Sequence, residues 1–527
     1  MKLKSACKRR VSVLERLCTV CIFACAAPSL GQVWTLGDVL DGPLQCDAQF
    51  GWALGGSGDL NADGLGDVAA GARFFNVDAN TAAGAVFVFR GGGPPGSPAL
   101  LRIDGLSAHE HFGESLAGGR DINGDGHPDL VVGAPLRTVA GLSACGAVDV
   151  FLGGAAFSGQ RWATLAGAAC DDWFGQSVAL GDVNGDGFAD VIVGAPYSDL
   201  GGSAAGSAYV FLGGPTPPTG SFVVLIGQNP NDQFGWSVAY AGDMNGDGFG
   251  DIAVGARLFG FGPAQARGKV YLFRGGAAMD AVPDGTWLGA AANDWFGNSV
   301  AAPGDVDGGG RADLLVGAPY NDAAASNAGA AYLFRGEDTP GSPAAVVYHG
   351  ESADAQFGWN VAGAGDVNGD GQPDMVVGAR LQSVGGLSAA GRAYLFLGGA
   401  PLSSSPAAIA NGAAANDWFG QAVGAASGYF QTDHGAAIVG APYNDAVASA
   451  AGRAYVYAAP PICPVGDVDA DCDVDLADLA ALVGCLGGPG TTPSASCATG
   501  IHADVDGDID VDLRDFGWLQ TSFTGPH

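Results

Sequence analysis

Basic residues are scarce in this sequence. Its 527 residues contain 22 Lys and Arg against 54 Asp and Glu, so the formal net charge is −32. Such a charge repels nucleic acid phosphates, which excludes nucleic acid as an expected partner. Charged residues of both signs make up only 14% of the chain, whereas hydrophobic residues make up 48%, so the chain can form packed domains.

Sequence motifs of several enzyme classes are also lacking. The seven His residues are scattered, and neither a Gly-x-Ser-x-Gly elbow nor a His-Glu-x-x-His pair is present. The repeats and the C-terminal module described below leave no span for a separate catalytic domain. We therefore predict that the protein is not an enzyme, and we assign no catalytic residue.

Long apolar runs are confined to the start of the chain. Lys2, Lys4 and Lys8 precede an apolar run over residues 17–27, which is followed by Pro28. This order predicts a secretory signal peptide over residues 1–31. A membrane anchor is the alternative, although the run is short for a bilayer, and no later stretch approaches that length. We expect a secreted or cell-surface protein without a transmembrane segment.

Glycine, in contrast, is abundant, and it belongs to a repeat. The 90 Gly residues are spread along the whole chain, which indicates many tight turns. The dipeptide Phe-Gly recurs at steps of 60 to 62 residues, so seven units of one period cover residues 33–458. The seven Phe residues are Phe50, Phe112, Phe174, Phe234, Phe296, Phe357 and Phe419.

Each repeat has the same internal order, and the third illustrates it. An alternating segment over 174–179 precedes an acidic loop over 182–190, and apolar segments follow over 191–196, 208–212 and 222–226. These four short segments are rich in β-branched and aromatic residues, which favours strands. We therefore predict an all-β fold over residues 32–459, a seven-bladed β-propeller of four-stranded antiparallel blades.

The two ends of the repeat region indicate how the ring closes. The seventh repeat ends at Tyr457, after its third strand, while residues 33–36 precede the first Phe-Gly and have the pattern of a fourth strand. We expect this N-terminal strand to complete the last blade, because closure removes exposed sheet edges. An open array of hairpin sheets is the alternative.

Five repeats carry an acidic nine-residue loop after the Phe-Gly strand. Asp or Asn fills places 1, 3, 5 and 9 around a glycine turn. Alternating oxygen ligands suit a hard cation, and the absence of His and thiolate ligands disfavours zinc, so we predict Ca²⁺. The predicted ligands are Asp59, Asn61, Asp63, Asp67, Asp121, Asn123, Asp125, Asp129, Asp182, Asn184, Asp186, Asp190, Asp243, Asn245, Asp247, Asp251, Asp366, Asn368, Asp370 and Asp374.

Two repeats depart from this pattern. The fifth loop keeps Asp305, Asp307 and Asp313 but has Gly309 at place 5, so we expect weaker binding there. The seventh loop has lost the acidic residues, and we expect no site in it. Its four ligand places hold Gly428, Phe430, Thr432 and Ala436.

The repeat carries a family resemblance. Phe-Gly, then Asp-x-Asn-x-Asp-Gly-x-x-Asp, then Gly-Ala-Pro resembles the FG-GAP repeat, the unit of the integrin α-subunit propeller. The resemblance covers residues 33–458. It implies a seven-bladed propeller with calcium in hairpin loops, and a role in adhesion or ligand capture.

The strand order also predicts a ligand-binding face. In a four-stranded meander the acidic loops leave one face of the ring, so the loops before Phe-Gly and after Gly-Ala-Pro leave the other. Trp, Tyr and Asp side chains in those loops suit a glycan or protein ligand, although packing between blades is the alternative. The candidates are Asp172, Trp173, Tyr197, Asp199, Trp295, Tyr320, Asp322, Trp418, Tyr443 and Asp445.

Three cysteines fall within the repeats. Cys145 and Cys170 belong to loops on this same face, near one blade junction, and we expect that they pair. This pairing leaves Cys46 single.

The composition changes after Pro461. Two runs of alternating Asp fill the places of EF-hand-like loops, and each precedes apolar residues at helical spacing. Residues 460–527 thus resemble a dockerin type I module, which implies a small helical calcium-binding domain and a cohesin-like partner. Place 6 holds Cys472 and Ile509 instead of Gly, and Ile at a left-handed position is costly, so the second loop departs from the usual geometry. A calcium-stabilised tail without a partner is the alternative. The Asp residues are Asp467, Asp469, Asp471, Asp473, Asp475, Asp478, Asp504, Asp506, Asp508, Asp510, Asp512 and Asp515.

Taken together, these patterns predict a secreted, calcium-binding adhesion or ligand-binding protein. Its calcium would be structural, and its ligand would be a protein or a glycan on the propeller face. The alternative is a carbohydrate-active extracellular enzyme, or a component of an enzyme complex, with paired carboxylates on the face opposite the calcium loops.

Overall fold

A computed structural model describes residues 34–260, 265–336, 339–430 and 434–458. The chain divides into a unit of residues 1–459 and a second unit of residues 460–527. The predicted signal peptide, Thr432 and the predicted dockerin-like module all lie outside the described residues. No helix that is long and apolar enough to cross a membrane occurs in the described part of the chain.

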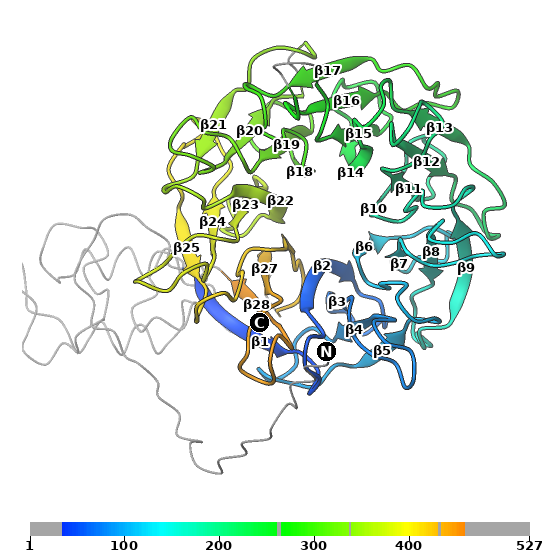
Figure 1. The fold of residues 1–527 in the computed structure, drawn as a ribbon, viewed down its shortest axis with the longest axis vertical. Coiled ribbons are helices and arrows are strands. Elements are labelled where there is room, and N and C mark those ends of the chain that lie inside the picture. The colour runs from blue at the N-terminus through cyan, green and yellow to red at the C-terminus, as the bar shows by residue number, and fades with distance from the viewer. Residues whose placement is uncertain (1–33, 261–264, 337–338, 431–433, 459–527) are drawn as a thin grey trace, which may run out of the picture. The chain divides into compact units, whose positions relative to one another are not determined.

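The described residues form seven four-stranded antiparallel sheets, as the sequence predicts. Figure 1 shows these sheets arranged in a ring, with the first strand of each repeat nearest the centre. Neighbouring innermost strands contact one another around the whole ring, including β26 against β2. They are β2 (Phe50–Gly58), β6 (Ser115–Arg120), β10 (Ser177–Gly181), β14 (Phe234–Gly242), β18 (Ser299–Gly304), β22 (Phe357–Gly365) and β26 (Val423–Ala425).

The second strand of every blade is buried along its whole length. Because neighbouring blades cover both faces of these strands, apolar residues occupy them continuously instead of alternating. They are β3 (Asp67–Ala72), β7 (Asp129–Ala134), β11 (Asp190–Ala195), β15 (Asp251–Ala256), β19 (Asp313–Ala318), β23 (Asp374–Ala379) and β27 (Ala436–Ala441).

The third strands follow, and each carries one or two aromatic residues. They are β4 (Ala85–Phe89), β8 (Ala147–Phe151), β12 (Ser207–Phe211), β16 (Lys269–Phe273), β20 (Ala330–Phe334), β24 (Arg392–Phe396) and β28 (Arg453–Ala458). The outermost strands are β5 (Leu101–Asp104), β9 (Arg161–Ala166), β13 (Val223–Ile226), β17 (Gly285–Leu288), β21 (Val346–His349), β25 (Ala408–Asn411) and β1 (Thr35–Asp41).

The first strand of the chain closes the ring. The seventh sheet has the order β1-β28-β27-β26, so residues from the start of the described chain lie beside its end. Thr35 pairs with Ala458 and Asp41 pairs with Arg453, in antiparallel register. Trp34 stacks on Tyr457 with 5.1 Å between ring centroids, which extends the contact beyond the strand. The strand runs to Asp41, five residues further than the segment expected from the sequence.

The Phe-Gly and Gly-Ala motifs have a common structural reason. Each Phe of Phe-Gly is at most 1% exposed and lies between two blades, a burial worth about 1.5–3 kcal/mol per side chain. A Cβ atom on the Gly of Gly-Ala would overlap the carbonyl oxygen of the Phe-Gly glycine in the next blade. This holds from Gly71 against Gly113 through to Gly440 against Gly51, so blades pack closely because both glycines lack side chains.

One blade junction contains a chain of buried ion pairs. Arg137 contacts Glu110 and Asp149, each at 2.9 Å, and Arg161 contacts Asp149 at 2.7 Å. Asp149 is fully buried on β8, at the place where the other third strands have Phe or Tyr. Burial alone would raise the pKa of Asp149, but Arg137 and then Arg161 outweigh that effect and hold the pKa below its usual value.

Candidate functional site

The predicted calcium loops all connect the first strand of a blade to its second. In the third blade, for example, the loop follows β10 at Gly181 and ends at Asp190, the first residue of β11. The loops therefore leave the ring at one face, and the loops before Phe-Gly and after Gly-Ala leave it at the other.

An intact loop is organised by its own carboxylates. Asp182 Oδ1 accepts a hydrogen bond from the Gly185 N–H at 2.7 Å, and its Oδ2 accepts one from Gly187 at 2.9 Å. Asn184 Oδ1 accepts from the Asp186 N–H at 3.0 Å. The second, fourth and sixth loops repeat this arrangement. Oxygen atoms from places 1, 3 and 5 thus gather around one tight turn.

The Asp at place 9 is buried in all six acidic loops. Asp190 is representative: its Oδ2 accepts from the Val183 N–H at 2.8 Å and its Oδ1 from the Gly213 N–H at 2.9 Å. Burial raises the pKa of each such carboxyl to about 6, and the other loop aspartates add to the increase, against the opposing effect of the backbone hydrogen bonds. These residues are Asp67, Asp129, Asp190, Asp251, Asp313 and Asp374.

In two loops, the fifth and the first, a buried carboxylate oxygen lacks a hydrogen-bond donor among the described residues. Carboxylate oxygens of Asp305, Asp307 and Asp313 lie within 4.8 Å of one another in the fifth loop. Asp305 Oδ1 is buried and accepts no hydrogen bond from the described residues, and the same is true of Asp67 Oδ2 in the first loop. The donor set is entirely oxygen, with repelling carboxylates around one point, which fits Ca²⁺. Arg335 Nε lies 2.6 Å from Asp307 Oδ2, so this arginine would compete with a cation for the Asp307 carboxylate.

The seventh loop is built differently. Gly428, Phe430 and Ala436 supply no side-chain oxygen. The Tyr429 hydroxyl instead donates to Asp38 Oδ2 at 2.7 Å, and both residues are at most 3% exposed. A hydrogen bond to the ring-closing strand β1 thus replaces the acidic loop in this blade.

On the opposite face, the predicted Trp and Tyr residues form pairs within one blade. The ring centroids lie 4.5 Å apart in Trp173–Tyr197, 4.5 Å in Trp295–Tyr320 and 4.4 Å in Trp418–Tyr443. Each pair joins the loop before Phe-Gly to the loop after Gly-Ala-Pro, and all six side chains are half-buried. The pairs therefore hold these two loops together and still present aromatic surface.

The predicted acidic candidates on this face divide into two groups. Asp172 is 3% exposed, and its Oδ2 accepts from the Ala169 N–H at 3.1 Å, so this side chain is held inside its loop. The other three are exposed, and each accepts one backbone hydrogen bond from five residues further along the chain, at 2.7 to 2.8 Å. These three are Asp199, Asp322 and Asp445.

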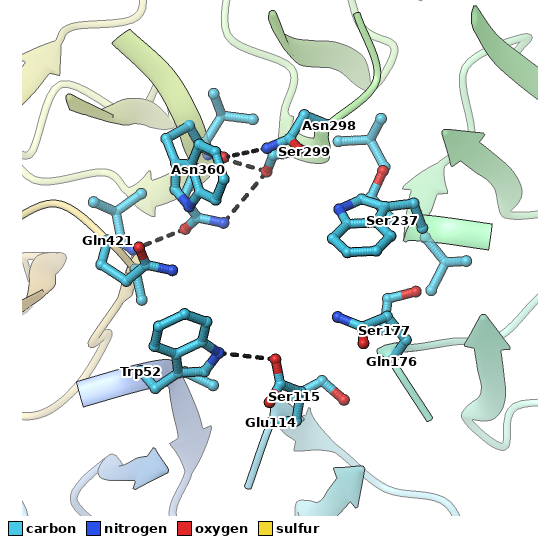
Figure 2. A pocket seen from close by; sticks show the side chains of 18 of the residues that line it. Trp52, Glu114, Ser115, Gln176, Ser177, Ser237, Asn298, Ser299, Asn360 and Gln421 are labelled. Carbon is cyan, nitrogen blue, oxygen red and sulfur yellow. Dashed lines mark hydrogen bonds between the residues drawn. The ribbon is translucent and has the colours of Figure 1, made fainter. Parts of the chain in front are cut away.

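A central cavity of about 670 Å³ lies where the innermost strands begin. Figure 2 shows side chains from different blades pointing toward this shared space, among them Trp52, Gln176, Asn298 and Gln421. The candidates Trp173, Trp295 and Tyr320 also line it. The cavity thus opens among the loops of the face predicted to bind ligands.

Three arginines of this cavity were not recognised from the sequence. Blades one, four and six have Gly-Ala-Arg in place of Gly-Ala-Pro, together with Trp directly after Phe-Gly. The guanidinium carbons of these arginines lie 3.0 to 3.1 Å from the centroid of that Trp ring. The co-occurrence of the two changes in the same repeats is the signal that could have revealed them. The pairs are Arg73 with Trp52, Arg257 with Trp236 and Arg380 with Trp359.

The expected disulfide is not formed. Cys145 and Cys170 are both free: Cys145 is buried, with its thiol next to the backbone carbonyls of Arg137 and Gly146, and Cys170 is exposed. Cys46, expected to be single, is disulfide-bonded. Both parts of that prediction are wrong.

Comparison with known families agrees with the motif order. The FG-GAP repeat family matches residues 112–151, 174–211, 234–273 and 357–396, and a second FG-GAP repeat family matches residues 288–334. This chain carries FG-GAP repeats. The matched segments run from the Phe-Gly region to the third strand of blades two to six.

Curated relatives of the FG-GAP region include integrin α subunits. The chain is 34% identical to integrin alpha-5 of Xenopus laevis over 220 residues, which are 40% of this chain and 20% of the relative. It is 36% identical to integrin alpha-3 of Cricetulus griseus over 166 residues, 30% of this chain and 15% of the relative. Integrin alpha-V of Gallus gallus is 34% identical over 227 residues, with coverages of 40% and 20%. The chain thus spans at most a fifth of these relatives.

Among solved structures, a crystal structure of BBS1N in complex with ARL6DN covers 82% of this chain and 98% of that chain. The two share 9% identity, with a TM-score of 0.45, and a similarity of this size carries no argument about function.

Proposed function

We propose that this protein is an extracellular ligand-binding or adhesion protein whose propeller is stabilised by calcium in the loops of one face and captures its ligand on the other. The repeated acidic loop is the observation that carries the proposal. Six loops bury a carboxylate at place 9 beside two or three further acidic or amide side chains, and an ion bound there would offset their repulsion. The similarity to integrin α subunits supports an adhesive role.

The alternative of a glycosidase needs two carboxylates across a substrate cleft. Glu114 is the one carboxylate among the residues that line the central cavity, and it is bound by Arg73 at 3.1 Å and by the Trp52 indole N–H at 3.0 Å. The aromatic and amide lining of the cavity suits binding better than acid-base chemistry. The dockerin-like C-terminal module, with a cohesin-like partner, remains part of the proposal.

The test is a thermal melt of the secreted protein with calcium, with magnesium and with a chelator. We expect calcium to raise Tm strongly and magnesium to raise it less, because magnesium requires a rigid octahedral shell. Binding to the folded state alone stabilises it by about 2.7 kcal/mol per site at a hundred times Kd. An unchanged Tm after chelation would contradict the calcium part of the proposal. The ligand-binding part is tested separately, by screening the calcium form of the protein on glycan and protein arrays.

A pair of variants assigns the effect to the loops. Asp186→Ala removes the place-5 ligand of an intact loop and should lower calcium stoichiometry by one in titration calorimetry. Gly309→Asp restores that ligand in the fifth loop. The φ of Gly309 is not positive, unlike that of Gly308 and Gly310, so a side chain is allowed there. We expect Gly309→Asp to tighten the weakest propeller site, and equal affinity in both proteins would argue against the loop assignment.

A further inference from the structure

The three arginines of the central cavity share one hydrogen-bond arrangement, but only Arg73 has a carboxylate partner among the described residues. Each donates through Nε to the Gln that precedes its Phe-Gly, at 2.8 to 2.9 Å. Arg73 also pairs with Glu114 of the next blade at 3.1 Å. Asn298 and Gln421 occupy the position of Glu114 in the blades that follow Arg257 and Arg380. Within the described residues, neither Arg257 nor Arg380 forms an ion pair with a carboxylate.

These two guanidinium groups are nevertheless mostly removed from water. Arg257 and Arg380 are each 9% exposed. Burial lowers the pKa of Arg257 to about 9 and that of Arg380 to about 10. The positive charge of Arg380 also lowers the pKa of Arg257. Burying a cation without a counter-ion is costly, and this chain has an excess of acidic residues that could have supplied one. A bound anion would offset this cost.

A hydrogen-bond acceptor without a donor lies in the same cavity. Asn298 is 6% exposed, its Nδ2 donates to the Trp359 carbonyl at 2.9 Å, and its Oδ1 is buried and accepts no hydrogen bond from the described residues. A ligand hydroxyl could supply that donor. Beside Ser and small apolar residues, the lining contains further amides and half-buried Trp rings, which bind sugar hydroxyls and sugar ring faces.

We propose that the central cavity binds an acidic sugar, with its carboxylate between Arg257 and Arg380 and a hydroxyl donating to Asn298 Oδ1. This inference rests on the proposed function, because it names the ligand class and the subsite of the ligand-binding face. The volume of about 670 Å³ accommodates one or two sugar rings. An acidic peptide would supply the carboxylate, but it lacks the several hydroxyl groups of a sugar that could hydrogen-bond to the amides of the lining. The sugar is therefore favoured.

Calorimetric titration of the calcium-loaded protein with methyl glucuronide tests the proposal. The uncharged 6-methyl ester of the same sugar is the matched ligand control. We expect the ester to bind about 10-fold or more weakly, since a hydrogen bond to a charged group contributes at least that much. Equal affinity for the acid and the ester, or tighter binding of an acidic tripeptide than of the sugar, would overturn the proposal.

Variants of the three arginines separate charge from folding. Arg257→Gln with Arg380→Gln should lose the preference for the acid, whereas Arg73→Gln should change it little because Glu114 already neutralises Arg73. Glu114→Gln leaves Arg73 without its counter-ion and should increase affinity for methyl glucuronide, an effect that misfolding cannot produce. Unchanged binding in both Glu114→Gln and the double variant would contradict the assignment.

The result also distinguishes this inference from the proposed function. Array ligands that still bind the double variant would leave a calcium-stabilised binding protein with its site elsewhere on the face. A calcium form without any ligand, and with an unchanged Tm after chelation, would instead remove the proposed function itself.

Discussion

At the scale of single residues, three sets of buried charged groups among the described residues differ in what surrounds them. The place-9 aspartates lie among other acidic residues in the loops, and Arg257 and Arg380 lie among neutral residues in the cavity. Asp149, in contrast, has its counter-ions within the chain, since it contacts Arg137 and Arg161. A bound cation or anion would offset the charge of the first two sets, whereas that of the third is offset by arginines of the chain itself.

Asp149→Asn should destabilise the propeller by about 3–5 kcal/mol at pH 7, because it leaves Arg137 and Arg161 without a shared carboxylate. The folded-state pKa of Asp149 lies below its unfolded value of about 3.9, so the ion pair stabilises the fold above that pH and is lost as pH falls through the folded pKa. Urea unfolding measures the difference in free energy of unfolding between the parent and the variant. This difference should have its largest value at pH 7 and should decrease below pH 4.

Glu351→Gln is the matched control for this prediction. Glu351 pairs with Arg392 at 2.5 Å, but its side chain is 44% exposed, so its loss should cost less than about 1 kcal/mol. Equal effects of the two substitutions at pH 7, or an Asp149→Asn effect that does not begin to shrink as pH falls below 4, would show that the buried ion pairs are not what stabilises this junction.

The position and turn geometry of the acidic loops could be predicted from the sequence, because the same spacing of Asp, Asn and Gly recurs in five repeats. Asp182, Asn184 and Asp190 lie at fixed places within one short turn, and such local spacing can be read directly from the sequence. The cavity could not be found in this way, because Arg257 and Arg380 belong to different blades and line one cavity only in the closed ring. The burial of Asp172 likewise depends on how its loop folds back.

At the scale of elements, the glycines of Gly-Ala and Phe-Gly allow neighbouring blades to pack closely. Gly440→Ala should place a Cβ against the carbonyl oxygen of Gly51, where the last blade meets the first. We expect a loss of about 1–3 kcal/mol or more, since backbone cannot yield as a flexible side chain does. Gly55→Ala, in strand β2, is the matched control because no atom lies within 4 Å of its added Cβ. Chemical denaturation compares them, and similar midpoints would refute the packing argument.

The sequence predicted the strands themselves well, because the second strands form short apolar runs between turn signals and recur at one period. It predicted the seventh inner strand less well. That blade lacks its acidic loop, and β26 is reduced to Val423–Ala425, with Tyr429 bonded to Asp38 instead. A contact between residues that are 391 positions apart has no signature in local pattern.

At the scale of the whole molecule, β1 is the element on which closure depends. Deletion of residues 34–41 should leave β28 as an unpaired edge and remove Asp38 from Tyr429. We expect the truncated protein to associate through that edge, because unpaired strands recruit others. Light scattering after gel filtration measures this against a chain that begins at residue 32. A truncated protein that stays monomeric and retains its Tm would show that closure does not need β1.

The register of β1 against β28 also determines how the ring responds to force. Thr35 lies opposite Ala458, so the two ends of the described ring lie side by side at the same end of one antiparallel pair. Tension applied between those ends would pull the backbone hydrogen bonds apart one after another, which is the weak direction for a strand pair. Because β28 is also paired with β27, it would stay in the sheet after β1 had been peeled away, so the ring would open first at its N-terminal strand.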